Sequence, residues 1–397
     1  MKRYQLICLT LFAAAAFFCA CEWDGPTALW DQPYEEAPGP SISNVNPAEA
    51  EAGVNYITIA GSNFSSTDEN IGAKVYFDGY HAEVMAITST EIRVRRPNIT
   101  GESTIKVVNL DGFNYASYGP YTVGTAYEPY GDYDGANAFT AMTVDRDENV
   151  YTTHMNPRSV YKVTPDGSRT EIGLVEKLMT DILVDADGNL VLLFKNDEIH
   201  KMNVTTGEET LWIDVGEKVA FGDFDSQGNL YAGGIKTDLV VVQSDETVHL
   251  LGTYASDRIN AVRVYNGYVY LLVDMNKPDE EHPDLAIWRH PILDASGNLG
   301  PAELVLNWEE TGEFAESTPA DFTFDEDGIL YVATDYTYPI LMVDPSGPQD
   351  ILYKDIIPTE AQTLVWGAGN DLYMVQGDAD ILLRIFMGKS GAPVYGG

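Results

Sequence analysis

DADGNLV, at residues 185–191, is one of six versions of a seven-residue stretch that recurs along the chain. The others are DRDENVY at 145–151, DSQGNLY at 225–231, VYNGYVY at 264–270, DEDGILY at 325–331 and GAGNDLY at 367–373. Each version joins an Asp, Gly or Asn turn to the start of an apolar, β-branched or aromatic run. This is how two antiparallel strands are connected, so each stretch predicts a hairpin.

The six stretches begin at residues 145, 185, 225, 264, 325 and 367, a period of about 40 residues with one long interval. A period in this range is typical of an array of identical supersecondary units. Six antiparallel units most economically form a six-bladed β-propeller, which we place at residues 139–397. The long fourth interval has its excess in segments 276–283 and 307–319.

The Asp-rich runs at 185–190 and 325–330 also invite comparison with calcium loops. A calcium loop of the EF-hand type requires further ligands and a Glu at its twelfth position. Here each run is followed by a strand pattern and repeats at the spacing of the blades. We therefore interpret the runs as turns, in which Asp accepts a local backbone hydrogen bond and Gly or Asn takes the left-handed conformation.

Residues 1–20 read as a secretory signal peptide, with Lys2 and Arg3 before an apolar stretch from Leu6. Cleavage after Ala20 would leave Cys21 first, and this arrangement resembles the bacterial lipoprotein lipobox, although Phe18 stands where Leu is usual. The resemblance implies lipidation of Cys21 and attachment to the outer membrane. The alternative is ordinary cleavage after Ala20, which would release a soluble periplasmic protein.

Three cysteines, Cys8, Cys19 and Cys21, are the only ones in the chain, so the predicted domains contain no disulfide. With 61 acidic and 23 basic residues, the formal net charge is −38. Such a surface repels phosphate backbones, which argues against nucleic acid as a partner. It suits neutral or cationic ligands and divalent cations.

Residues 21–39 are rich in Pro, Gly and acid and predict a flexible tether. Residues 40–123 alternate apolar and polar positions between Gly-rich turns, which predicts a small β-sandwich. They resemble the IPT/TIG immunoglobulin-like family in the runs Ile57-x-Ile59-x-Gly61-x-Asn63-Phe64, Val75-x-Phe77-Asp78-Gly79 and Thr90-x-Ile92-x-Val94. That resemblance implies a spacer or interaction module without catalytic residues. Residues 124–138 are expected to be a linker.

The repeats resemble NHL-type propellers and the six-bladed senescence-marker/gluconolactonase group. Four residues before each turn stretch, where the inner strands would begin, the chain has Ala141, Asp181, Phe221, Asn260, Asp321 and Thr363. Oxygen ligands at Asp181, Asn260 and Asp321 suit a hard cation such as calcium. In the gluconolactonase-like group, comparable positions hold a divalent cation. The alternative is a water-filled polar channel.

Ligand-binding candidates on the same face are loop aromatics and histidines, which could stack on sugar rings or bind their hydroxyls. They are Trp308, Tyr336, Tyr338, His154 and His282. Trp212, Trp288 and Trp366 lie at or beside predicted strands and are expected in the core. The chain has no Gly-x-Ser-x-Gly motif and no phosphate-binding Gly loop.

Three functions are compatible with these patterns. The order of anchor, tether, immunoglobulin-like unit and propeller resembles accessory glycan-binding lipoproteins of Bacteroidota polysaccharide-uptake systems, whose partners are a TonB-dependent transporter and its companion lipoprotein. The second function is a metal-dependent hydrolase of the lactonase type, working at the Asp181/Asn260/Asp321 ring. The third is a cell-surface scaffold for protein interactions.

Overall fold

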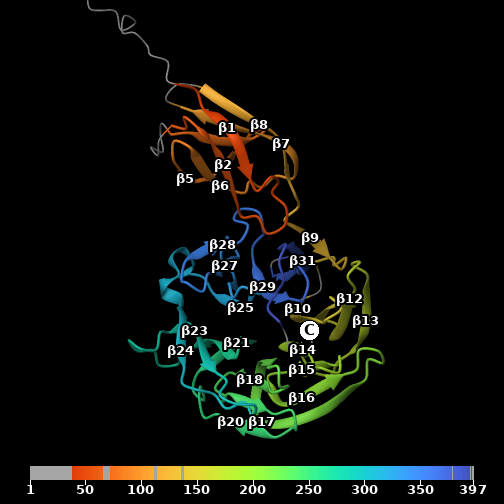
Figure 1. The fold of residues 1–397 in the computed structure, drawn as a ribbon. Coiled ribbons are helices and arrows are strands. Elements are labelled where there is room, and N and C mark those ends of the chain that lie inside the picture. The colour runs from red at the N-terminus through yellow and green to blue at the C-terminus, as the bar shows by residue number, and fades with distance from the viewer. Residues whose placement is uncertain are drawn as a thin grey trace, which may run out of the picture.

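The computed structural model describes residues 38–65, 72–110, 114–135, 138–377, 379–393 and 395. The predicted signal peptide, Cys21 and nearly all of the predicted tether lie outside these residues. Apart from two short 3-10 turns, the regular elements are strands, and they form a small sandwich beside a ring of sheets (Figure 1). The predicted all-β fold is confirmed. Within the described residues, no helix is long and apolar enough to span a bilayer.

The sandwich consists of two four-stranded antiparallel sheets. One contains β1 (Ser41–Asn46), β2 (Tyr56–Ser62), β6 (Glu91–Arg95) and β5 (Val84–Ile87), and the other contains β4 (Tyr80–Ala82), β3 (Lys74–Phe77), β7 (Gly101–Asn109) and β8 (Asn114–Val123). Alternate residues of β2 and β3 point inward, so that Ile57, Ile59, Val75 and Phe77 are fully buried. The predicted alternation therefore produces the core between the sheets.

The propeller begins with blade 1 and continues with two blades that share a strand. Blade 1 contains β10 (Phe139–Val144), β11 (Val150–His154), β12 (Ser159–Val163) and β13 (Arg169–Leu174). Blades 2 and 3 form one seven-stranded sheet of β14 (Asp181–Val184), β15 (Leu190–Leu193), β16 (Asn196–Met202), β17 (Glu209–Phe224), β18 (Leu230–Gly234), β19 (Val240–Val242) and β20 (Val248–Leu250). The long β17 is the outer strand of blade 2 and then the inner strand of blade 3.

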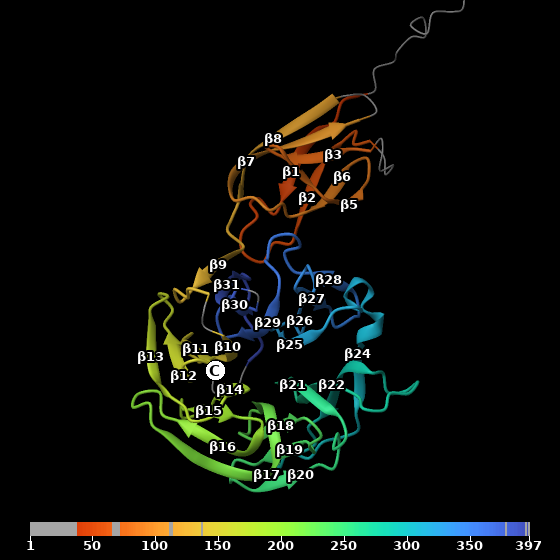
Figure 2. The ribbon, with the colours of Figure 1, turned by 180° about the vertical axis from the view of Figure 1, so that it is seen from behind.

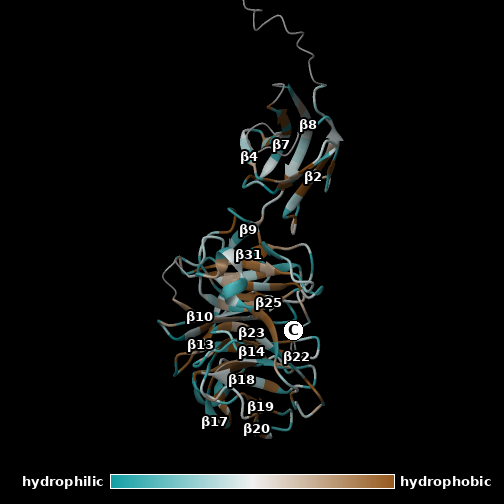
Figure 3. Ribbon diagram, turned by 90° about the vertical axis from the view of Figure 1, so that its left-hand side faces the viewer, coloured by the Kyte–Doolittle hydropathy of each residue, from teal (hydrophilic) through white to brown (hydrophobic). Residues whose placement is uncertain are grey.

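The remaining blades complete the ring seen from behind in Figure 2. Blade 4 contains β21 (Arg258–Tyr265), β22 (Tyr268–Asp274), β23 (Leu285–Pro291) and β24 (Glu303–Asn307). Blade 5 contains β25 (Pro319–Phe324), β26 (Leu330–Thr334), β27 (Ile340–Val343) and β28 (Gln349–Ile351). Blade 6 contains β29 (Ala361–Trp366), β30 (Asp371–Gln376) and β31 (Ile381–Phe386). The first strand of each blade contacts the first strand of the next around the centre. From the side, hydrophobic segments lie along the strands and the loops are largely hydrophilic (Figure 3).

The fourth strand of blade 6 comes from the segment that the sequence predicts to be a linker. β9 (Tyr127–Tyr130) pairs with β31 in antiparallel register, from Tyr127 opposite Ile385 to Tyr130 opposite Leu382. The linker prediction for 124–138 is therefore wrong at these residues. The physical reason is closure: the strand that precedes blade 1 in sequence completes the last blade and so joins the two ends of the ring.

The repeated Asp has the turn role that the sequence predicts. In blade 3, Asp225 Oδ1 accepts hydrogen bonds from the backbone N–H groups of Gln227 (2.8 Å) and Asn229 (2.9 Å), and Gly228 has φ of 85°. Its Oδ2 accepts from the Tyr231 hydroxyl at 3.1 Å. The same backbone pattern recurs at Asp145, Asp185 and Asp325. Each carboxylate thus fixes the turn between the first two strands of its blade.

A polar junction joins the sandwich to the rim of blades 5 and 6. The buried Tyr353 hydroxyl donates to the Phe386 carbonyl (2.7 Å) and accepts from the Gly53 N–H (2.6 Å). Asp350 accepts from the Tyr56 hydroxyl and from Arg95, at 2.6 and 3.2 Å. Because these bonds satisfy groups on both domains, they hold the sandwich in one orientation beside the ring.

We expect Asp225→Ala to lower the free energy of unfolding by about 2–4 kcal/mol, because it leaves two turn N–H groups and the buried Tyr231 hydroxyl without their acceptor. Chemical denaturation measures this loss. Asp245→Ala is the matched control, since Asp245 makes a similar but fully exposed turn in the same blade. Equal losses in the two variants would contradict a structural role for the buried turn carboxylate.

Candidate functional site

The six positions aligned from the sequence meet in one cavity at the centre of the ring. Ala141, Asp181, Phe221, Asn260, Asp321 and Thr363 all line a cavity of about 640 Å³, which we call the channel mouth. Each residue lies at or near the start of an inner strand, and these strands contact one another. A fixed offset from a repeated turn therefore located one layer of the channel.

Two of the predicted metal ligands bind the backbone of the neighbouring blade instead. Asp181 Oδ2, in blade 2, accepts a hydrogen bond from the Gly222 N–H of blade 3 at 3.0 Å. Asp321 Oδ2, in blade 5, accepts from the Leu364 N–H of blade 6 at 3.1 Å. The second oxygen of each carboxylate accepts from the N–H of the following residue. These aspartates therefore join adjacent inner strands across the gap between blades.

Asp223 and Arg263 complete this group. Asp223 Oδ2 accepts from the Val264 N–H at 2.7 Å, which links blades 3 and 4 in the same way. The Arg263 guanidinium donates to both oxygens of Asp321, at 2.8 and 3.0 Å. It is also close enough to Asp181 and Asp223 to stabilise their charged forms. We call Asp181, Asp223, Asp321 and Arg263 the channel belt.

Burial and the positive charge act in opposite directions on the carboxylates of the belt. Burial raises the pKa of Asp181 to about 7 and that of Asp223 to about 6, and it raises the pKa of Asp321. The Arg263 guanidinium opposes each rise because it favours the ionised carboxylate. One guanidinium thus stabilises the ionised forms of three carboxylates.

The predicted calcium site at Asp181, Asn260 and Asp321 does not fit this arrangement. The cation beside the two carboxylates is the Arg263 guanidinium, and their oxygens already accept backbone hydrogen bonds. Among the residues that the structure describes, no group of three or more His, Cys, Asp or Glu side chains is placed to hold a metal ion. Asn260 lines the mouth without a hydrogen bond to either aspartate.

Two of the predicted ligand-binding residues are core side chains. Trp308 is 2% exposed, and its indole N–H donates to the Ser317 carbonyl at 2.9 Å. His154 is 3% exposed and stacks on Tyr161 at 4.6 Å, and burial lowers its pKa to about 4. Both predictions are corrected: His154 is the last residue of strand β11 and packs inside blade 1, and the 3-10 turn that begins at Trp308 directs the indole into the core.

The other three candidates are partly accessible but lie away from the channel mouth. Tyr336 and Tyr338 are half-buried and meet edge to face at 5.7 Å, and the Tyr336 hydroxyl donates to Glu313 at 3.2 Å. His282 is exposed and lies against Trp288 with ring centroids 5.8 Å apart. His282 and Trp288 line a separate cavity in blade 4.

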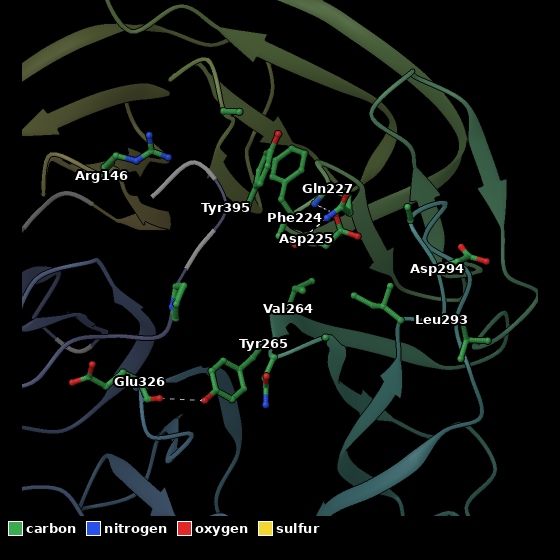
Figure 4. A pocket seen from close by; sticks show the side chains of 17 residues that line it. Arg146, Phe224, Asp225, Gln227, Val264, Tyr265, Leu293, Asp294, Glu326 and Tyr395 are labelled. Carbon is green, nitrogen blue, oxygen red and sulfur yellow. Dashed lines mark hydrogen bonds between the residues drawn. The ribbon is translucent and has the colours of Figure 1, made fainter.

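A third and larger cavity, of about 1030 Å³, opens on the opposite face, where the turns lie (Figure 4). Tyr395, near the end of the chain, packs against Phe224 in its wall with ring centroids 5.2 Å apart. A constriction of about 50 Å³, lined by Tyr395, Asp223 and Arg263 among others, lies between this cavity and the channel mouth. A space of that size admits water but not a sugar ring.

The sequence reasoning missed Asp223 and Arg263. A single offset samples one layer of the channel, and side chains on one face of a strand recur every two residues. Asp223 lies two residues after Phe221, so it belongs to the next layer. Arg263 stands between Val262 and Val264 in an inner strand, and a charge flanked by two apolar residues was the available signal.

The fold and the site define a two-domain protein with a propeller whose channel contains an internal ion-pair network. Residues 40–123 match the IPT/TIG domain model, and no curated protein matches the chain. A solved auxiliary nutrient binding protein from Bacteroides ovatus is 12% identical, with a TM-score of 0.51 and coverage of 89% of this chain and 99% of that chain. A second auxiliary nutrient binding protein, from Bacteroides thetaiotaomicron, is 11% identical, with a TM-score of 0.54 and coverage of 88% and 98%.

A gluconolactonase from Xanthomonas campestris is 14% identical, with a TM-score of 0.51, and the match covers 64% of this chain and 87% of that chain. At these identities the likeness establishes the fold. The Bacteroides structures match along nearly their full length and along most of this chain. The gluconolactonase matches a smaller share of it.

We expect Arg263→Met to lower the free energy of unfolding by about 3–5 kcal/mol at pH 8, because three buried carboxylates lose their cation. The pKa values of Asp181 and Asp223 are raised in the folded state, so protonation stabilises the fold at low pH and this contribution is lost as the pH rises through 6–7. The loss caused by Arg263→Met should therefore be smaller at pH 5. Urea denaturation at the two pH values measures it.

Arg263→Lys is the matched control, because it keeps the positive charge and should lose less stability at pH 8. A loss that is the same at pH 5 and pH 8 in Arg263→Met would show that packing, and not charge, is what Arg263 contributes.

Proposed function

We propose that this protein is a surface-anchored binding module that captures a neutral oligosaccharide at the channel mouth, as an accessory to a polysaccharide-uptake system. The observation that carries the proposal is a set of polar side chains left available at the mouth. Asn260, Gln362 and Thr363 line the cavity and make no side-chain hydrogen bond within the described protein. The carboxylates of the channel belt, in contrast, already accept backbone hydrogen bonds within and between blades.

Amide and hydroxyl groups at the mouth suit sugar hydroxyls, which both donate and accept hydrogen bonds. Two exposed apolar side chains, Met155 and Leu178, line the same cavity and offer contact to the apolar face of a ring. The strongly acidic chain repels anionic polymers, which favours a neutral glycan over an acidic one. The constriction below the mouth makes it a closed-ended site.

The anchor and the partners in this proposal rest on the sequence and on the names of structural neighbours. The two Bacteroides structures are called auxiliary nutrient binding proteins, and this chain matches them over nearly their whole length. For this chain we propose a lipid on Cys21, an outer-membrane location and a complex with a TonB-dependent transporter. The sandwich then acts as a rigid spacer.

The lactonase alternative requires a divalent cation that polarises a carbonyl and activates water. In the channel belt that place is taken by Arg263, which hydrogen bonds to Asp321. The geometry therefore favours binding over metal-dependent hydrolysis. A scaffold role has no specific observation in its favour.

We expect the protein to be retarded in native gels that contain a neutral polysaccharide, and Asn260→Ala to weaken the affinity for that polysaccharide about tenfold by removal of a ligand hydrogen bond. Affinity electrophoresis identifies the polysaccharide, and calorimetry with its oligosaccharides measures the dissociation constant. Gln362→Ala should have a similar effect.

Gln227→Ala is the matched control, because Gln227 is an exposed amide in the cavity on the turn face. Loss of binding in this variant alone would move the site to that face. Absence of retardation across neutral plant, host and microbial polysaccharides would overturn the proposed function.

We expect Cys21→Ala to move the protein from the outer-membrane fraction to the soluble fraction, because the lipidated residue would be lost. Cell fractionation with detection of the protein in each fraction measures the change. Cys19→Ala is the matched control and should leave the protein in the membrane. An unchanged membrane fraction in Cys21→Ala would contradict the anchor.

A further inference from the structure

Blade 4 holds a second cavity next to the channel mouth. Its volume is about 360 Å³, and it is lined by aromatic and apolar side chains that include Tyr254, Met275, His282, Trp288, His290 and Pro301. Arg258 and Asp274 are a cross-strand pair that lines the mouth, and the adjacent residues Asp257 and Met275 line the second cavity. The two cavities are therefore neighbours at one end of the blade.

Trp288 has an unpaired hydrogen-bond donor at this cavity. The side chain comes from β23 and is 5% exposed, and its indole N–H is shielded from solvent without a partner among the described residues. Buried donors are nearly always paired, because an unmade hydrogen bond costs free energy. A buried donor that lines a cavity points to an acceptor supplied by a ligand.

Two polar side chains of the cavity wall, His290 and Tyr254, are paired with each other. His290 Nδ1 is 2.9 Å from the Gly300 carbonyl, which can only accept, so this nitrogen carries the proton. The Nε2 atom of neutral His290 therefore accepts from the Tyr254 hydroxyl at 2.8 Å. Tyr254 itself has a left-handed backbone with φ of 68°, a conformation that is costly for a bulky residue. Among the buried side-chain groups of this wall, the indole N–H is thus the donor that remains for a ligand.

His282 partly covers the indole from solvent. The two rings are stacked with centroids 5.8 Å apart and planes 30° apart. The imidazole side chain is 51% exposed, and its Nδ1 is held 2.9 Å from Asp279. Both residues belong to the 276–283 segment, which lengthens blade 4 beyond the other repeats. Because exposed side chains change rotamer readily, the imidazole can swing aside and admit a ligand.

We propose that this cavity binds an N-acetylated hexosamine residue, with the acetamido carbonyl accepting from the Trp288 indole N–H and the acetamido methyl lying against Met275 and Pro301. One buried unpaired donor, with Met275 and Pro301 in the same wall, fits a group that combines one acceptor with a methyl. An unmodified hexose would bury hydroxyls without partners there. The neighbouring acids Asp257, Asp279 and Asp284 disfavour an anionic sugar.

This inference rests on the proposed function, since it makes the cavity a second subsite for a glycan held at the channel mouth. A glycan that passes the Arg258–Asp274 pair places one sugar residue at the channel mouth and the next sugar residue beside Trp288. The mouth then supplies polar contacts, and the second cavity recognises the acetamido substituent.

The test is a titration of the full protein with methyl β-N-acetylglucosaminide, followed through the indole ¹H–¹⁵N resonances of tryptophan. Trp288→Phe assigns the Trp288 signal, and the Trp212 signal is an internal control because its N–H is already bound to Glu246. We expect the Trp288 signal to shift downfield and saturate. Methyl β-glucoside should need about a tenfold higher concentration, the equivalent of one lost hydrogen bond.

No shift of the Trp288 signal, or equal half-saturation by the two methyl glycosides, would overturn the proposal. Asn260→Ala separates this result from failure of the proposed function. That variant should weaken polysaccharide retardation while the shift of Trp288 remains. Retardation of the wild type without any shift of Trp288 would leave the mouth as a binding site and remove the second subsite.

Discussion

The pairing of β9 with β31 closes the ring, and the rest of the structure depends on it. Without β9, blade 6 would have three strands, and no β-sheet would contain strands from both ends of the propeller sequence. Arg384 of β31 forms ion pairs with Glu128 of β9 and with Asp371 of β30, which ties the added strand into its sheet. Because β9 directly follows the sandwich, closure also places that domain at the rim beside β28 and β31 (Figures 1 and 2). The sandwich therefore covers neither face of the propeller.

Closure brings six inner strands together, and the channel belt determines what the resulting channel can do. Each of the three aspartates accepts a hydrogen bond from a backbone N–H group of the adjacent blade, and the Arg263 guanidinium compensates their negative charge. A buried network of this kind specifies how the strands meet but adds little net stability over an apolar core. It also removes the carboxylates from ligand chemistry. The free polar groups Asn260, Gln362 and Thr363 lie beside Asp181 and Asp321 in the wall of the mouth.

The sequence predicted the fold well because the signal repeats: each Asp turn reports the same hairpin, and its register carries over to the inner strands. It missed β9 because YEPY contains a proline and no alternation, and only closure of the ring gives it a partner. Trp308 was misplaced because a loop that looks polar folds into two 3-10 turns, Trp308–Glu310 and Gly312–Phe314, with the aromatic side chains inward. Contacts between segments distant in sequence decided both cases.

The departures from the repeat are concentrated in blade 4, which carries Arg263, the shortened hairpin and the lengthened second loop. Its hairpin is shortened to a two-residue turn with Asn266 and Gly267 at positive φ, and Arg263 lies just before it. Its second loop is lengthened by the segment that carries His282 over Trp288. In a repeat protein, regular units supply the scaffold, and insertions on one face supply recognition. Blade 4 thus contributes Asn260 to the channel mouth and also holds the second cavity, whereas residues of the other blades contribute to the mouth alone.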